Sequence, residues 1–150
     1  MREQGGSILD SGIKENADVG LHDCRSDRIR LEDRSVTFYI PDGFYFIRDA
    51  GSAENHSAEM CCHFVERADE SFSVSVYRKN LFGQTVREDR TDWFVSAVNA
   101  KKIEFEFVYT YRSYHGILFK GYIWRHRKPW GRECEVELRT DEITYSWIDR

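Results

Sequence analysis

The sequence predicts an α+β fold in which an antiparallel β-sheet carries one main helix on one of its faces. Two patterns indicate this fold. After Ile103, apolar and polar residues alternate with the period of two that is typical of half-buried strands. Before Ile103, residues 85–102 place apolar side chains at helical spacing. The expected order of elements is a hairpin, a second hairpin, the helix and a four-strand meander.

The first hairpin is expected to turn at Pro41-Asp42-Gly43. Proline presets φ for such a turn, and glycine can adopt the positive φ that a turn often requires. A polar loop over residues 49–57 separates this hairpin from the second one, which turns at residues 68–70. The strands of the two hairpins are predicted at residues 35–40, 44–47, 60–67 and 72–77.

The helix is expected to begin at Thr85, because Glu88 follows three residues later and the pair matches a capping box. It would end at Lys101 and Lys102, where cations interact favourably with the negative end of the helix dipole. The side chains expected on its apolar stripe are Val86, Trp93, Phe94 and Ala97.

The meander is expected to contain four strands, with turns at residues 113–116, 128–131 and 141–142. The second strand, residues 117–127, is apolar on both faces, as in a central strand covered on one side. If Arg127 pairs with Arg132 across the intervening loop, Tyr122 lies opposite Glu137 and Trp124 lies opposite Glu135. The residues expected to share one face of the first strand are Ile103, Phe105, Phe107, Tyr109 and Tyr111.

Residues 1–34 are expected to form a flexible polar tail, since their single aliphatic residues follow neither a helical nor a strand period. Residues 35–150 are expected to form one α+β domain. A chain of 150 residues suits a single domain and can bury one core.

The charge balance argues against nucleic-acid binding. The 22 basic and 26 acidic residues give a net charge of −4, and the two signs are interspersed, whereas binding to a phosphate backbone depends on clustered cations. No segment approaches the ~20 apolar residues of a membrane span, and residues 1–20 lack the apolar stretch of a secretory signal. We therefore expect a cytoplasmic protein with reduced cysteines and with neither nucleic-acid nor membrane partners.

The tripeptide Cys61-Cys62-His63 is the strongest candidate for a reactive group in the sequence, because a thiol beside an imidazole can become a thiolate nucleophile. Adjacent residues of a strand point to opposite faces, however, so Cys62 and His63 would not face each other. Two interpretations stay open. The cysteines are buried free thiols, or they line a pocket with a small-molecule or enzymatic role.

Three carboxylates, Glu133, Glu135 and Glu137, alternate along one predicted strand. Same-face residues stand about 7 Å apart, a spacing that could hold a cation or pair an acid with a base. The alternative is a solvated face whose carboxylates pair with arginines across the strands. Neither paired metal-ligand spacing nor a phosphate loop or dinucleotide fingerprint occurs. We therefore expect no metal, no cofactor and no catalytic residue.

The residues best suited to contact a partner are Tyr122, Trp124 and Trp130, because exposed aromatic side chains beside charges often mark an interaction site. Glu135 and Glu137 would lie beside the first two in the expected register. The alternative is that Tyr and Trp simply suit strands. We predict a non-enzymatic protein-binding domain, of adaptor, chaperone or immunity type, that uses the open face of its sheet. The sequence indicates neither the partner's identity nor the oligomeric state.

Residues 38–44 read Phe-Tyr-Ile-Pro-Asp-Gly-Phe, an early strand followed by a proline–glycine–aromatic turn. With the order of elements from Ser35 to Asp149, this resembles the fold family of the photosystem protein PsbP, which includes the nuclear-transport Mog proteins and DcrB-type effector chaperones. The resemblance implies a protein-binding scaffold without catalysis, often one that uses a concave sheet. The chain departs from many members because its last expected element is a strand and not a helix.

Overall fold

The computed structural model describes residues 7–12, 19–46, 57–114, 116–125 and 128–148, with the side chains of residues 7–12, 45–46 and 128–130 outside the described part. It is mostly antiparallel sheet, with 63% strand and two helices. The elements are β1 (Ser7–Gly12), β2 (Val19–Gly20), β3 (Arg25–Ser26), β4 (Arg28–Leu31), β5 (Ser35–Ile40), β6 (Tyr45–Phe46), β7 (Ala58–Phe64), α1 (Ala68–Ser71), β8 (Phe72–Lys79), β9 (Thr85–Asp89), α2 (Thr91–Asn99), β10 (Ile103–Arg112), β11 (Gly116–Arg125) and β12 (Lys128–Trp147).

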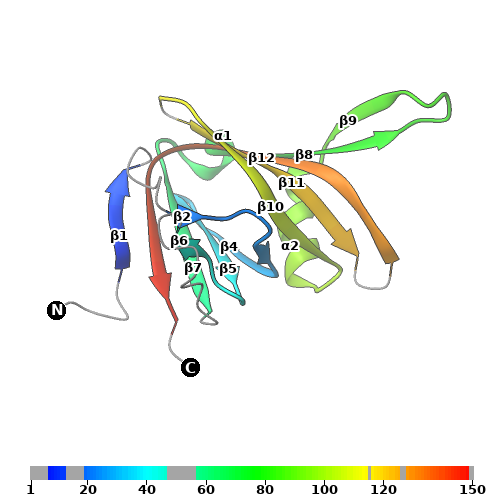
Figure 1. The fold of residues 1–150 in the computed structure, drawn as a ribbon. Coiled ribbons are helices and arrows are strands. Elements are labelled where there is room, and N and C mark those ends of the chain that lie inside the picture. Colours follow the sequence, from blue (N-terminus) through cyan, green and yellow to red (C-terminus); the bar gives the residue numbers. More distant parts are fainter. Residues whose placement is uncertain (1–6, 13–18, 47–56, 115, 126–127, 149–150) are drawn as a thin grey trace.

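β12 is the strand that two halves of the sheet share. Residues 128–139 pair with β11 along one edge, and residues 134–138 pair with β8 along the other. Residues 140–147 then pair with β7, and residues 142–146 with β1. Figure 1 shows β12 running along one side of the molecule, bending, and continuing down the other side. The sheet therefore folds over itself along this one strand.

The strands β3 and β4 connect the outer strands of the two halves. Ser26 of β3 pairs with Phe105 of β10, while residues 28–31 of β4 pair with β5. The Ser26 hydroxyl also donates a hydrogen bond to the carbonyl of Tyr39 in β5, at 2.9 Å. The two outer edges of the curled sheet are thus joined through β3 and β4. Its inner surface faces one apolar core.

The structure corrects the expected N-terminal tail. Residues 7–12 form β1, which pairs with β12, and residues 19–34 hold the short strands β2, β3 and β4. Val19 and Leu21 are buried to 6% exposure and Ile29 to 2%. Each lies in or beside a strand of only two to four residues, which is too short to show a hydrophobic period. Single aliphatic residues in a polar segment can therefore be core anchors. Residues 1–6 and 13–18 of the expected tail lie outside the described residues.

The centre of the core consists of phenylalanines from different elements. Phe107 of β10 packs edge-on against Phe38 of β5 and Phe119 of β11, with ring centroids 5.4 and 5.0 Å apart. Phe94 of α2 meets Phe105 in the same way at 5.8 Å. Edge-to-face pairs at these separations are favourable beyond their buried area. The alternation after Ile103 therefore does mark the inward face of β10 as far as Phe107.

The helix α2 begins at Thr91, so the expected start at Thr85 is wrong. Residues 85–89 form strand β9, which pairs with β8, and Glu88 bonds to Arg78 across that pair at 2.7 Å instead of completing a capping box. Asp89, just before the N-cap residue Arg90, accepts hydrogen bonds from the backbone N–H and hydroxyl of Thr91. Those bonds hold the pKa of Asp89 below its ordinary value.

The C-terminus of α2 is clamped to β4 by one amide side chain. Asn99 accepts a hydrogen bond from the backbone N–H of Ile29 and donates one to its carbonyl, both at 2.8 Å. The helix buries Phe94, Ala97 and Val98 against the sheet. The expected stripe is right for Phe94 and Ala97, whereas Val86 belongs to β9. The helix closes one end of the curled sheet.

Neither expected hairpin forms as a pair of neighbouring strands. Gly43 does take positive φ, 76°, in the expected turn, but β5 pairs with β4 and β7, while β6 pairs with β2. β7 and β8 lie end to end along β12, with the short helix α1 between them. The proline–glycine turn sets only where the chain changes direction. Which strands pair is set by how their apolar side chains pack in the core.

The expected turn at residues 141–142 is absent, and the meander has three strands, β10, β11 and β12. Thr140 is fully buried at this position, and its hydroxyl donates a hydrogen bond to the backbone carbonyl of His63 in β7. The polar pair Asp141-Glu142 instead lies within the bend of β12. Leu138 and Tyr145 therefore lie on one continuous strand.

Candidate functional site

A β-bulge in β10 reverses the faces of the residues that follow it. Phe107 pairs with Gly121 and Tyr109 pairs with Lys120, so Val108 is an extra residue between them. A Cβ at Gly121 would collide with the carbonyl oxygen of Glu106, and only glycine permits the two backbones to approach this closely. After Val108, odd-numbered residues of β10 point outward and not into the core.

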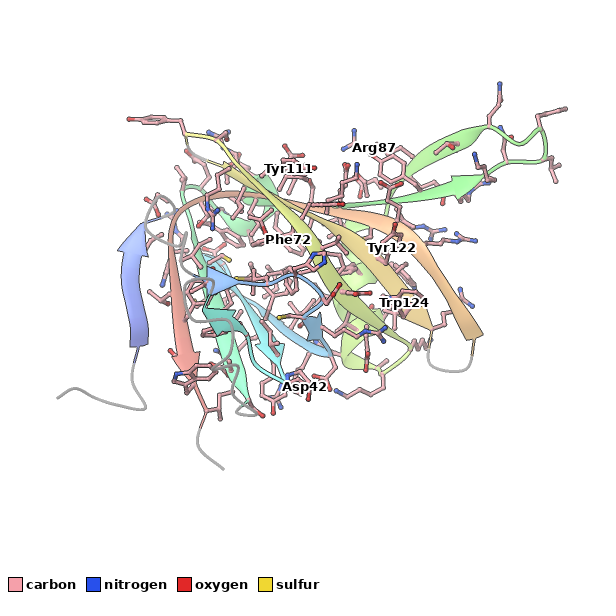
Figure 2. All side chains as sticks on the ribbon, viewed as in Figure 1. Asp42, Phe72, Arg87, Tyr111, Tyr122 and Trp124 are labelled. Atoms are coloured by element: carbon pink, nitrogen blue, oxygen red, sulfur yellow. The ribbon has the colours of Figure 1, made fainter. Side chains whose placement is uncertain are left out.

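The bulge places two tyrosines on the outer surface, beside a third on the neighbouring strand. Tyr109 is 56% exposed and Tyr111 is 53% exposed, and Tyr122 of the neighbouring strand is 41% exposed. Leu118 pairs with Tyr111 in the register of β10 and β11 and is half-buried. We call these four residues, Tyr109, Tyr111, Leu118 and Tyr122, the tyrosine face. Figure 2 shows Tyr111, Tyr122 and Trp124 spaced along this side of the sheet.

Trp124 lies at one end of the tyrosine face but is held by its neighbours. Its indole Nε1 donates a hydrogen bond to Glu106 Oε1 at 2.6 Å. The guanidinium of Arg25 lies 5.1 Å from the ring centroid, and the ring covers Gly131, where an added Cβ would lie only 3.1 Å from the ring atoms. Arg25 also pairs with Glu104 at 3.4 Å and approaches Glu106 at 4.0 Å. These contacts make Trp124 part of the sheet's own surface.

The carboxylates on β12 differ in what they contact. Lys120 lies between Glu133 and Glu135, at 3.2 and 3.9 Å, and the hydrogen bond with Glu133 raises the pKa of Lys120. Glu135 also accepts a hydrogen bond from the Tyr77 hydroxyl at 2.9 Å. Burial and this hydrogen bond raise the pKa of Tyr77. The interpretation of a solvated face with cross-strand charge pairs therefore describes Glu133 and Glu135.

Glu137 lies at the other end of the tyrosine face, opposite Leu118 in the register of β11 and β12. It is exposed. Together with Tyr111, Leu118 and Arg139 it lines an open hollow of about 390 Å³ beside the turn of the β10–β11 hairpin. The hollow is open to a side chain from a partner, and Tyr111 belongs both to its lining and to the tyrosine face.

The expected site residues are thus separated by the structure. The register differs from the expected one, since Tyr122 pairs with Glu133 and Trp124 with Gly131, because β11 and β12 already pair at their Arg125 and Lys128 ends. Tyr122 and Glu137 lie on the open surface, while Trp124 and Glu135 are engaged within the sheet. The side chain of Trp130 lies outside the described residues.

The sequence predicts Tyr109 and Tyr111 on the inward face, and that expectation is wrong. The signal that could have revealed them is Gly121, because an isolated glycine within a strand pattern indicates a bulge or a close backbone approach. The alternation of residues 103–111 has one break, at Val108, which is apolar where the pattern calls for a polar residue. One such residue does not by itself show that the faces reverse.

The Cys61-Cys62-His63 tripeptide lies on β7 with its middle residue turned into the core. Cys62 is fully buried, and burial raises the pKa of its thiol well above the ordinary value. Cys61 and His63 share the opposite face, with Sγ and Nε2 3.7 Å apart. The three side chains therefore cannot line one pocket, as the alternation along a strand requires.

Among the described residues, no group of three or more His, Cys, Asp or Glu side chains is placed to hold a metal ion. No helix within the described ranges has the length and apolar character that crossing a membrane requires. Comparison with known proteins finds no matching family model, no matching curated protein and no matching solved structure.

Proposed function

We propose that the chain is a non-enzymatic, cytoplasmic protein-binding domain that contacts its partner through the tyrosine face. The observation that carries this proposal is the set of three tyrosines, 41–56% exposed, that the Val108 bulge gathers on two adjacent strands. Tyrosine provides a large amphipathic contact area at a low cost in side-chain entropy, and it is enriched at interface hot spots.

The surroundings of the tyrosine face favour a protein as the partner. Glu133, Glu135 and Glu137 form a row along β12 beside it, and such a row repels a phosphate backbone. The face is a sheet surface with an open hollow at one end, whereas a small-molecule site usually encloses most of the surface of its ligand. A partner that presents apolar side chains to the exposed tyrosines would be complementary.

The rigidity of the surface supports the same proposal. Trp124, tied to Glu106 at 2.6 Å, and Lys120, held between two glutamates, fix the sheet around the exposed rings. Side chains held on strands are presented with less loss of conformational freedom than side chains on a loop. The tyrosines are therefore exposed on a preorganised surface.

The alternative, a small-molecule or enzymatic pocket near Cys61, Cys62 and His63, receives no support from the arrangement of these residues. Cys62 is buried in the core, and the other two side chains lie on the far face of β7. A thiol–imidazole contact of 3.7 Å on an open strand lacks the convergent polar groups of a catalytic site.

We include in the proposal an α+β class, with α2 as the main helix, and a topology like that of PsbP. The turn at Gly43, with φ of 76°, and the position of α2 directly before the β10–β11–β12 meander support it. The cytoplasmic location rests on the sequence pattern alone.

The test is an affinity capture with the chain immobilised, followed by measurement of the affinity for each captured protein. A variant carrying Tyr109→Ser, Tyr111→Ser and Tyr122→Ser should bind the partner at least about 30-fold more weakly, the effect of losing one hot spot. The control is Leu81→Ser with Phe82→Ser, which removes two still more exposed apolar side chains from the β8–β9 hairpin. Equal binding by the tyrosine variant and the wild type would refute the proposal.

A further inference from the structure

The β8–β9 hairpin projects from the body of the molecule as an arm with an apolar tip. Figure 1 shows it standing clear of the other elements. Leu81 is 100% exposed and Phe82 is 87% exposed, although these two residues are adjacent and large. Two neighbouring apolar side chains held this far into solvent indicate a contact with another molecule.

The tip is a fixed structure and not a loose loop. The side-chain carbonyl of Asn80 accepts hydrogen bonds from the backbone N–H groups of Phe82 and Gln84, both at 2.9 Å. The backbone of Asn80 closes the turn with Gln84 and Gly83, and Gly83 supplies a positive φ of 78°. The backbone that carries Leu81 and Phe82 is therefore fixed, which lowers the entropy lost on docking.

The stem behind the tip is cationic. In the strands behind the tip, residues 77–89, the three cations Arg78, Lys79 and Arg87 outnumber Glu88 and Asp89, in a protein whose net charge is −4. Arg78 is neutralised by Glu88 at 2.7 Å. Lys79 and Arg87 leave the arm with positive charge beside its apolar tip. The arm therefore fits an apolar surface with an acidic rim.

A hollow with this chemistry lies at the base of the same arm. It has a volume of about 820 Å³ and lies between β4, α1, the ends of the β8–β9 arm and the start of α2. Its apolar lining includes Leu31, which is 40% exposed, together with Trp93 and Val95 of α2. Its charged lining consists of three carboxylates, Asp69, Asp89 and Asp92, and one cation, Arg90.

We propose that the arm docks onto a second copy of this chain, with each tip filling the hollow at the base of the other arm. A contact in which each copy offers the same tip and the same hollow is isologous and closes as a two-fold dimer. Strand β9, which runs between the tip and the hollow, supports this arrangement. Within the described part of the chain, β9 pairs only with β8, so its other edge is open to a strand of the second copy.

The residue at the two-fold axis follows from the sequence of β9. In an antiparallel pair related by a two-fold axis normal to the sheet, one residue faces its own copy. Centring the pair on Arg87, Glu88 or Asp89 would oppose like charges, whereas Val86 would face Val86. With Val86 at the axis, Phe82 lies four residues before it and Arg90 four residues after it. The tip of one copy then reaches residues 90–92 of the other, which line the hollow.

This dimer uses no residue of the tyrosine face, so the two proposals can fail separately. Dimerisation is measured on the isolated chain, without the partner of the proposed function. Sedimentation of the wild-type chain should show a reversible monomer–dimer equilibrium. Leu81→Ser with Phe82→Ser should weaken the dimer at least about 30-fold. At a concentration low enough to keep both chains monomeric, the melting temperature should stay unchanged, because neither side chain is buried in the monomer.

A cysteine at the axis tests the register directly. Val86→Cys should form a disulfide-linked dimer on mild oxidation, since directly opposed residues have Cα atoms about 4.5–5.5 Å apart, within the disulfide range. The matched control is Thr85→Cys, an exposed neighbour that would face Arg87 of the second copy. Adding Leu81→Ser and Phe82→Ser to the Val86→Cys chain should abolish its disulfide-linked dimer.

Three results would overturn the proposal. One is a wild-type chain that sediments as a monomer at every concentration. Another is equal cross-linking of the Val86→Cys and Thr85→Cys chains. The third is a monomeric chain that binds vesicles rich in phosphatidylserine through Leu81 and Phe82, which would make a lipid surface the occupant of the tip.

Discussion

The indole of Trp124 donates a hydrogen bond of 2.6 Å to the carboxylate of Glu106 on the neighbouring strand. With Arg25 5.1 Å from the centroid of the same ring, this contact divides the aromatic residues of one surface into two groups. Trp124 completes the surface of the sheet, and the three tyrosines beside it stay open to solvent. The two groups should respond differently to substitution.

Replacing Trp124 by phenylalanine should lower the free energy of unfolding, because Glu106, whose side chain is only 14% exposed, loses its closest donor. A hydrogen bond to a charged group contributes about 1.5–3 kcal/mol to stability. Because Glu106 keeps some contact with water, we expect a loss at the lower end of this range, about 1.5 kcal/mol. Urea denaturation measures it. The control Tyr122→Phe should change stability by less than about 0.5 kcal/mol. Equal losses in the two variants would contradict the structural role of Trp124.

The bulge at Val108 depends on Gly121, and Gly121→Ala should be strongly destabilising. The new methyl group would collide with the carbonyl oxygen of Glu106, so the backbone of β10 or β11 must move. We expect a loss of about 3 kcal/mol or more in urea denaturation. Gly83→Ala is the control, because that position has positive φ but open space around it. Its strain should cost only about 1–2 kcal/mol. A tolerated Gly121→Ala would show that the two strands do not approach in this way.

The four cysteines should react with iodoacetamide in a definite order. Cys61 is half-buried on the outer side of β7, whereas Cys62 and Cys134 are fully buried. Burial, aided by Asp23 and Asp42, raises the pKa of Cys24 to about 12, so very little of it is thiolate near neutral pH. Peptide mass spectrometry should find Cys61 labelled first and Cys62 and Cys134 labelled only on unfolding. Early labelling of Cys62 would contradict its inward orientation.

Stability should decline in alkaline solution. The pKa of Cys24 rises from 9.0 to about 12 on folding, so the folded chain holds this proton more tightly than the unfolded chain. The corresponding stabilisation is complete below about pH 9 and is lost as the pH rises towards 12. Urea denaturation across this range measures the slope. Cys24→Ser should reduce the slope by at most about 1.4 kcal/mol per pH unit, and an unchanged slope would show that burial does not shift this thiol.

The sequence predicts the local pattern of this fold better than its pairings. The period of two correctly marks the inward residues of β10 up to Phe107, and the turn at Gly43 is correct. The bend of β12 is not visible in the sequence, because Asp141-Glu142 reads as a turn and the buried hydroxyl of Thr140 finds its acceptor only in β7. The anchors of the N-terminal strands are single residues, which leave no period.

In the candidate site too, the sequence predicts the local pattern better than the contacts between strands. Tyr122 and Glu137 are exposed as expected, but Tyr109 and Tyr111 depend on one extra residue in β10. Whether Trp124 is available to a partner depends on Glu106 and Arg25, which come from other strands. Composition and alternation indicate which strands carry aromatic residues. Register decides which of those residues reach the surface.

Hydroxyl-radical footprinting of the chain with its captured partner tests the tyrosine face most directly. The three tyrosines are 41–56% exposed in the free chain, so a partner seated on them should lower the oxidation of Tyr109, Tyr111 and Tyr122 together. Oxidation of Leu81 and Phe82 should not change when the partner is added. Protection of the arm or of β7, with the three tyrosines oxidised as in the free chain, would contradict the proposed function.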